Sequence, residues 1–290
     1  MMVRAGRIGL GVYLLADALD VGYSYLTIRP PVELYGMLAG DDFDGADATF
    51  ARQLGGGVGR IRVLGGRLPF ETALANGSVI DANATRIFGI TADYLYREWQ
   101  TRAALLQIHV PNSADPVAPA LVRTGIAQAV ALAGELEHSP QDSYGVVIGT
   151  LYEGDPLQAA LVLVHFNSDY PQGPKFNAGF GLVGYRLGPL TPYAAYSITD
   201  SFGSARTTGL PPLPVFEPLI AAAAADQTAT QANQRDLALG VRYDFAPHVD
   251  LKAQVDRTWL HQSDLIFDYN VPPPGHTALT IFGLAVDFAF

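Results

Sequence analysis

Residues 235–259, RDLALGVRYDFAPHVDLKAQVDRTW, alternate between apolar and polar side chains in two successive runs. A period of two is typical of β-strands, because successive side chains of a strand point to opposite faces. The runs meet at Ala246-Pro247, which predicts a short turn between two paired strands. One face of each strand is apolar and the other is charged, so the fold depends on which face points to the interior.

The same alternation recurs along the chain and predicts about twelve strands. Most are ~9–13 residues long, which is long for a soluble domain and sufficient to cross a bilayer at a tilt. The predicted strands are residues 2–13, 45–54, 58–68, 85–97, 99–110, 143–153, 156–167, 175–187, 189–199, 234–245, 248–259 and 277–290.

The connections between these strands alternate strictly between short and long. A soluble β-sandwich has no physical reason to sort its loops by side, whereas an outer-membrane barrel does so. The long connections are residues 14–44, 69–84, 111–142, 169–174, 200–233 and 260–276. We therefore expect an all-β fold, a transmembrane antiparallel up-and-down β-barrel that forms a single domain over residues 1–290. Its apolar faces would contact lipid and its charged faces would line a water-filled interior.

Aromatic side chains cluster near the predicted strand ends, as expected for girdles at the two membrane–water interfaces. These residues are Tyr94, Tyr96, Trp99, Tyr144, Tyr152, Tyr185, Tyr193, Tyr196, Tyr243, Phe245, Phe288 and Phe290.

The composition excludes several classes of function. The chain is 49% hydrophobic and 16% charged, and its net charge of −10 argues against nucleic acid as a partner. It has no cysteine, so neither disulfides nor thiolate metal sites are possible. Its six histidines lack close metal-binding spacing, and no serine lies in a Gly-x-Ser-x-Gly frame. We therefore predict no metal, no cofactor and no enzymatic activity. The alternatives are an outer-membrane barrel hydrolase of phospholipase type and a soluble β protein.

Four segments resemble Gram-negative outer-membrane porins of the general and phosphate-type superfamily. They are VRAGRIGLGVYLLADALDVGYSYLTIRPPVELYG at 3–36, FDGADATFARQLGGGVGRIRVLGGR at 43–67, LVGYRLGPLTPYAAYS at 182–197 and the last strand, TALTIFGLAVDFAF, at 277–290.

The resemblance implies an integral protein of the bacterial outer membrane, through which small hydrophilic solutes or ions diffuse passively. The last strand resembles the signal read by the barrel-insertion machinery, and such a strand ends in the periplasm. The short turns are then periplasmic and the long loops extracellular. Porins of this type usually have 16 strands, which implies that a signal peptide and about four strands are missing from the N-terminal part. A 12-stranded barrel is the alternative. The resemblance also implies a homotrimer in contact with outer-membrane lipid.

Strand parity selects a set of charged residues that would line the pore and bias its ion selectivity. They are Arg7, Arg60, Arg62, Arg102, Arg186, Arg242 and Lys252, with Asp93, Asp236, Asp244, Asp250, Asp256 and Asp287. Each is alternatively a hydrated wall residue paired with a neighbour of opposite charge.

Two long loops are candidates for a constriction of the pore. In loop 14–44, Tyr25 and Arg29 precede Pro30-Pro31, which stiffens the chain and removes two backbone donors. Loop 111–142 contains Arg123 and a predicted helix over 113–138, capped by Asp115. We expect this helix either to fold into the barrel or to lie across its mouth. For Arg29 in the first loop, the alternatives are a contact with solute and a role in packing. The alanine-rich stretch 219–232 is expected to be a mobile loop with about one helical turn.

Overall fold

The protein is described here by a computed structural model in which twelve strands form one antiparallel sheet. The structure describes residues 1–290 except 15, 17–20, 38–39, 70, 74–78, 82–83, 111–116, 138–140, 170–172, 229–230, 262–275 and 289–290. The strands of the sheet, in order, are β1 (Met2–Gly9), β2 (Asp42–Leu54), β3 (Gly57–Arg67), β6 (Arg86–Tyr96), β7 (Trp99–Val110), β8 (Gln141–Glu153), β9 (Leu157–Ser168), β10 (Phe176–Tyr185), β11 (Leu190–Ser201), β12 (Asn233–Ala246), β13 (Val249–His261) and β14 (His276–Phe288). A small separate pair, β4 (Glu71–Ala73) and β5 (Val79–Asp81), belongs to the connection between β3 and β6 in the sequence.

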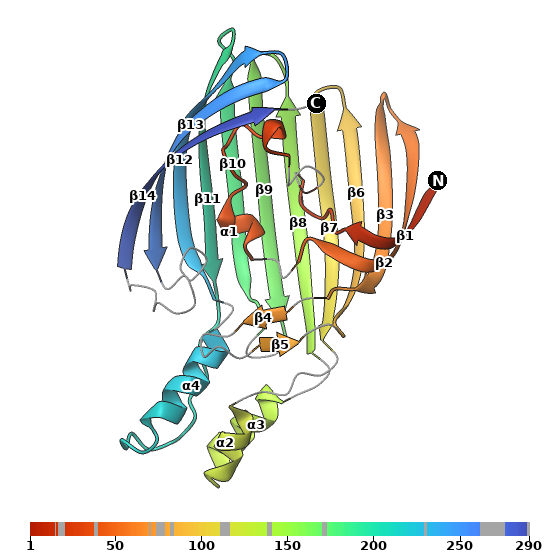
Figure 1. Ribbon diagram of the computed structural model, residues 1–290. Coiled ribbons are helices and arrows are strands. Elements are labelled where there is room, and N and C mark those ends of the chain that lie inside the picture. The colour runs from red at the N-terminus through yellow and green to blue at the C-terminus, as the bar shows by residue number, and fades with distance from the viewer. Residues whose placement is uncertain are drawn as a thin grey trace.

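The large sheet is strongly curved, and its concave side faces the viewer in Figure 1. Each strand pairs with its neighbours in sequence, as in an up-and-down barrel. Strands β1 and β14 form the two edges, so closure of the predicted barrel is not seen among the described strands. The prediction of twelve antiparallel strands is confirmed.

Short turns lie at the upper end of the sheet in Figure 1, and long connections lie at the lower end. Strand β14 ends at the upper end, because Phe288 pairs with Val249 directly after the short turn between β12 and β13. The predicted sorting of the loops by side is therefore confirmed. Phe290 lies outside the described residues.

The apolar face of the strands points away from the concave side, as the sequence predicts. Leu239, Leu251 and Phe282 have relative exposures of 49%, 39% and 82%, whereas Lys252 on the opposite face is fully buried. An aqueous β protein would show the reverse, because water favours burial of the apolar face. The outer, convex face is therefore suited to lipid.

Two rows of aromatic side chains border this convex face. Phe88 and Tyr144 share the row nearer the long loops, because both pair with Gln107. Tyr96, Trp99 and Tyr152 share the other row, eight residues further along each strand. Eight residues at ~3.4 Å each, tilted by roughly 40°, span ~21 Å, which is close to the ~25 Å apolar band of outer-membrane barrels.

Most of the predicted girdle residues lie on the convex face, but Tyr193 does not. Its side chain is 5% exposed and donates a hydrogen bond from Oη to Gln254 Oε1 at 2.7 Å on the concave side. The prediction was wrong there because β11 alternates, so Tyr193 and the exposed Tyr196 lie on opposite faces.

The first strand is shorter than the predicted 2–13, because the chain leaves the sheet after Gly9. The described residues of the segment 10–37, which we call the lumen insert, run along the concave side, where Figure 1 shows them in red in front of the sheet. The insert contains the 3-10 turn η2 (Gly22–Ser24) and the short helix α1 (Val32–Tyr35).

The lumen insert packs on an apolar cluster of the concave face. Its buried side chains Leu10, Val12, Tyr13, Leu14 and Leu34 contact wall residues of the middle strands. The main wall residues of this cluster are Leu64, Ile87, Leu106, Val162, Phe166, Phe176 and Phe180. The concave side is therefore apolar near its middle strands and charged elsewhere.

Helices occur in the long loops, at the lower end of Figure 1. The predicted helix 113–138 is two helices, α2 (Ala118–Arg123) and α3 (Ala127–Leu136), separated at Gly125, whose φ is +66°. Asp115 lies outside the described residues. The alanine-rich stretch forms α4 (Glu217–Thr228), a longer helix than predicted.

The three helices share one apolar cluster, which includes Leu121, Leu132, Leu136, Leu210 and Ala223. Loop 111–142 therefore packs against loop 200–233, beyond the end of the sheet. In the described part of the chain, no helix combines the length and apolarity required to span a membrane.

We predict that a charge on the convex face is costly in a depth-dependent way. Ile148 lies midway between Tyr144 and Tyr152 and is 54% exposed, so Ile148→Arg should destabilise the protein in lipid vesicles by ~2–4 kcal/mol. Leu157→Arg, at the short-turn end of β9, should cost only ~0–1 kcal/mol. Denaturant unfolding in vesicles measures both, and equal costs would contradict a lipid-facing convex surface.

Candidate functional site

Arg62 on β3 holds the start of the lumen insert against the wall. Its guanidinium donates to the carbonyls of Gly9 at 3.0 Å and Leu10 at 2.8 Å, and to Asp47 of β2 at 2.7 Å. Asp47 is fully buried at its side chain and also accepts hydrogen bonds from Arg4. Hydrogen bonds from a charged donor contribute ~1.5–3 kcal/mol each, so Arg62 is a strong anchor.

Arg102 on β7 makes a similar set of contacts directly after these, at Gly11 and Tyr13. Its Nη1 donates to the carbonyls of Gly11 and Tyr13, both at 2.8 Å, and its Nε donates to Asp93 of β6 at 2.6 Å. Burial raises the pKa of the Tyr13 phenol, and the neighbouring Tyr35 raises it further. This part of the insert is thus neutral and is held through its backbone.

Arg242 on β12 binds the insert at a second site, near η2. It donates to the Tyr23 carbonyl at 2.7 Å and lies over the Tyr23 ring, 4.5 Å from its centroid. Its charge is balanced by Asp244 at 2.8 Å and Asp250 at 3.0 Å.

Lys252 on β13 completes this second site. Its buried Nζ donates to the Gly22 carbonyl at 2.7 Å and pairs with Asp287 of β14 at 2.9 Å. A Cβ at residue 22 would overlap Asp287 Oδ1, so a larger residue there would require the Asp287 side chain to shift. Four wall cations therefore bind backbone carbonyls of one segment, each beside a wall carboxylate.

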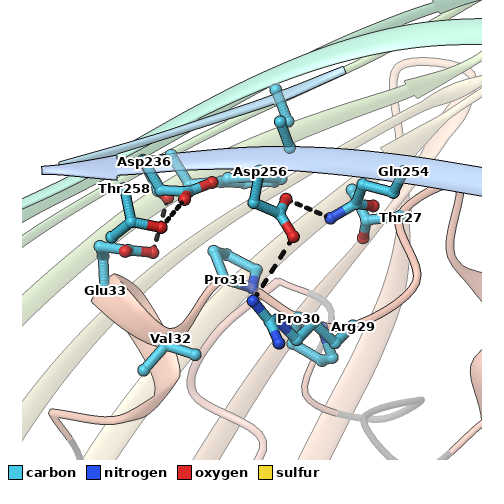
Figure 2. Close-up of a pocket in the computed structure, with 14 residues that line it drawn as sticks. Thr27, Arg29, Pro30, Pro31, Val32, Glu33, Asp236, Gln254, Asp256 and Thr258 are labelled. Atoms are coloured by element: carbon cyan, nitrogen blue, oxygen red, sulfur yellow. Dashed lines mark hydrogen bonds and ion pairs between the residues drawn. The ribbon is translucent and has the colours of Figure 1, made fainter. Parts of the chain in front are cut away.

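A third contact surrounds the proline pair, as Figure 2 shows. Arg29 lies 3.5 Å from Asp256, and the Ile28 amide donates to Gln254 Oε1 at 2.9 Å. Asp256 also accepts from Gln254 Nε2 at 2.5 Å. On the same wall, Thr258 donates to Asp236 at 2.5 Å (Figure 2).

Glu33 of α1 extends this contact to β11 and β12. Its carboxylate accepts hydrogen bonds from Ser197, at 2.7 Å, and from Gln234. The cavity enclosed by this contact has a volume of about 30 Å³, room for one or two water molecules. It is therefore too small for a sugar or an amino acid, and this part of the site is structural.

Most of the predicted pore-lining residues meet at the lumen insert. The structure brings together Arg62, Arg102, Arg242, Lys252, Asp93, Asp236, Asp244, Asp250, Asp256 and Asp287, with Tyr25 and Arg29 on the insert. A selectivity role for them stays a prediction. Their observed contacts are to the insert, to each other and to neighbouring wall residues such as Asp47, Gln254 and Thr258.

Four predicted residues lie elsewhere. Arg7 pairs with Asp44 at 2.9 Å on the convex face, so its predicted inward orientation was wrong. The error arose because alternation along β1 places Ile8, not Arg7, on the concave side. Arg60 is exposed on the concave face, Arg186 is exposed beside the short turn after β10, and Arg123 lies on α2 beyond the sheet.

Other residues that hold the insert are less evident from the sequence. Gln254 shares the face of Lys252 by strand parity and could have been selected. Glu33 could not, because its partners Ser197 and Gln234 are 164 and 201 residues away in sequence. Within the described residues, no group of three or more His, Asp or Glu side chains is arranged to hold a metal ion.

Comparison with known proteins supports the architecture at the level of the fold. No protein-family model matches the chain, and no curated protein matches it in sequence. Solved structures that it matches include outer-membrane proteins, and the chain has the fold of Gram-negative outer-membrane porins.

One of these structures is OmpT, an outer-membrane protein of Vibrio cholerae. The membrane-expressed form gives a TM-score of 0.53 at 12% identity, over 99% of this chain and 76% of that chain. The in-vitro folded trimer form gives 0.52 at 11% identity, with the same coverage. The NanC porin matches with a TM-score of only 0.35 at 8% identity, over 84% of this chain and 92% of that chain, which is too low to carry weight.

We predict that Arg62 and Arg60, two residues apart on the same face of β3, differ sharply in their effect on the insert. Arg62→Gln removes charged hydrogen bonds to Gly9 and Leu10 and should lower the free energy of insert opening by ~2–4 kcal/mol. Arg60→Gln should leave it unchanged. Hydrogen exchange of the amides of residues 10–14 in the folded protein measures this difference, and equal exchange in the two variants would contradict the anchoring role.

Proposed function

We propose that the chain is an outer-membrane porin, a water-filled channel for passive diffusion of small hydrophilic solutes or ions. The observation that carries this proposal is the inverted sheet, which is apolar on its convex face and charged on its concave face outside the apolar cluster of the middle strands, with an extra segment held inside the curve. A lipid-facing wall and a polar interior are what a diffusion channel requires.

The lumen insert acts as the constriction in this proposal. It occupies the concave side and is held by Arg62, Arg102, Arg242 and Lys252, so it narrows the space available to solutes. Loop 111–142 packs with α4 beyond the sheet, which supports its alternative position across the mouth.

Wall charges would serve two purposes. The buried cations are occupied by carbonyls and carboxylates, so they set the shape of the channel and contribute little free charge to it. Arg60 is exposed on the concave face and has no ion-pair partner among the described side chains, which makes it the better candidate for ion selectivity. Arg29, with its side chain 48% exposed, is the corresponding group on the insert.

The proposal includes the topology and the assembly. Residues 1–290 form one barrel domain, short turns face the periplasm, and helices α2 to α4 face the cell exterior. Insertion depends on the last strand, and the protein forms a homotrimer; OmpT of Vibrio cholerae, whose fold is similar, has been solved in a trimer form.

The proposal is tested by the conductance of the full-length gene product in planar lipid bilayers. Stepwise, ohmic conductance is expected from protein that is folded in detergent. Folded protein that inserts into the bilayer without conductance steps would contradict a channel, and protein that stays in solution without detergent would favour a soluble β protein.

Arg60→Gln should reduce the anion preference of this channel. A unit charge ~10 Å from the ion path contributes ~0.4 kcal/mol in water, so its removal should lower the anion-to-cation permeability ratio about two- to fourfold. Reversal potentials in a salt gradient measure the ratio. Arg97→Gln, in the short turn between β6 and β7, is the matched control and should leave it unchanged. An unaltered ratio in Arg60→Gln would remove Arg60 from the selectivity mechanism.

A further inference from the structure

A row of ionisable side chains crosses the convex face at the long-loop end of the sheet. The register places Asp44 opposite Arg67, Arg67 opposite Arg86, and Arg86 opposite His109. His109 is in turn opposite Asp142. Residues directly opposite each other in a sheet share a face, so all five point outward with the exposed Phe88 and Leu105.

The carboxylates at the two ends of this row have polar partners. Asp44 accepts both hydrogen bonds of the Arg7 guanidinium, at 2.9 and 3.0 Å. Asp142 lies 3.1 Å from His109 Nδ1 and accepts from Gln107 at 3.2 Å. The carboxylates of Asp44 and Asp142 therefore already have partners other than the two arginines at the centre of the row.

The centre of the row is a pair of arginines without partners. Arg67 and Arg86 are exposed and directly opposite each other, and neither has a hydrogen bond or ion pair in the described part of the chain. Like charges directly opposite in a sheet are destabilising. An anion between the two guanidinium groups would replace this repulsion by attraction, because arginine binds phosphate oxygens in a bidentate manner.

The surface next to this pair is apolar on the side of the membrane. Phe88, which belongs to the aromatic row nearer the long loops, is two residues from Arg86 along β6. Val63, Ile90 and Leu105 continue the same exposed surface toward the middle of the sheet, with relative exposures of 40%, 39% and 58%. An anionic group bound at the arginines would therefore have space for acyl chains directly below it.

We propose that Arg67 and Arg86 form a binding site for a phosphate group of an anionic lipid in the outer leaflet. The site rests on the proposed function, because it requires that the long loops face the cell exterior. The ligand class is a phosphorylated glycolipid, since such a molecule combines a phosphate at the level of the arginines with chains along Val63, Ile90 and Leu105. A solute phosphate in the pore would not reach the site, because both side chains point away from the concave side.

The test compares lipid retention by the full-length protein and by the double variant Arg67→Gln/Arg86→Gln. The protein is purified in detergent, exchanged with a diphosphorylated glycolipid, and examined by native mass spectrometry. The double variant should retain the lipid at least about tenfold less tightly. Arg52→Gln removes an exposed arginine from the convex face at the opposite, short-turn end of β2 and should retain it like the parent protein.

Three further measurements identify the ligand. The dephosphorylated glycolipid with the same chains should bind weakly to all variants, and equal binding would overturn the phosphate assignment. Inorganic phosphate at millimolar concentration should not displace the lipid, and displacement would indicate a site for a free anion. An equal loss in Arg52→Gln would indicate nonspecific charge attraction and would overturn the site.

Failure of this inference can be separated from failure of the proposed function. Conductance of the same preparations is measured in bilayers, where the double variant should conduct like the parent protein. Loss of conductance with retention of the arginine-dependent lipid would contradict the channel alone, and unchanged lipid binding in a conducting double variant would contradict the lipid site alone. If the double variant does not fold, Arg86→Gln takes its place, with an expected loss of about threefold.

Discussion

The arrangement of the interior depends on hydrogen bonds from buried wall cations to backbone carbonyls. Arg62, Arg102, Arg242 and Lys252 each donate to carbonyls of the lumen insert and each lie beside an aspartate of the same or a neighbouring strand. A buried charge is costly unless it is paired and hydrogen-bonded, and here both conditions are met. The carboxylates balance the charge of the wall cations. The N–H groups of each cation that do not contact a carboxylate bind the lumen insert, which has little regular secondary structure of its own.

This arrangement gives the charged face of the sheet a structural purpose. In an open aqueous pore, wall cations would be hydrated and would act on passing ions. In this protein the insert replaces much of that water, and the charges that remain exposed are few, with Arg60 the clearest case on the wall. In the proposed channel, the width and the ion preference would therefore depend on different residues, although Arg60 and Arg62 lie on the same face of one strand.

The strands could be predicted from the sequence because lipid and a polar interior impose opposite demands on alternate residues. Segments such as 234–259 carry that pattern clearly, and β7 matches its predicted bounds at both ends. The pattern failed at Arg7 and Tyr193, where the face of a single residue depends on register. The path of the insert was not predictable, because carbonyl acceptors are present in every residue and leave no signature in the sequence. Arg62 and Arg102 were selected correctly as inward-facing residues, but their hydrogen bonds to the insert were not foreseen.

The helical loops have a consequence for engineering. Helices α2 and α3 belong to the connection between β7 and β8, and α4 belongs to the connection between β11 and β12, yet they share one apolar cluster. Gln128 donates to Thr207 at 2.9 Å, and Arg206 pairs with Glu135, which joins the two connections further. Each connection buries apolar surface of the other, so the two form one structural unit. If either connection were transplanted alone into another scaffold, its apolar surface would be exposed to solvent. If both were transplanted together, this surface would stay buried between them.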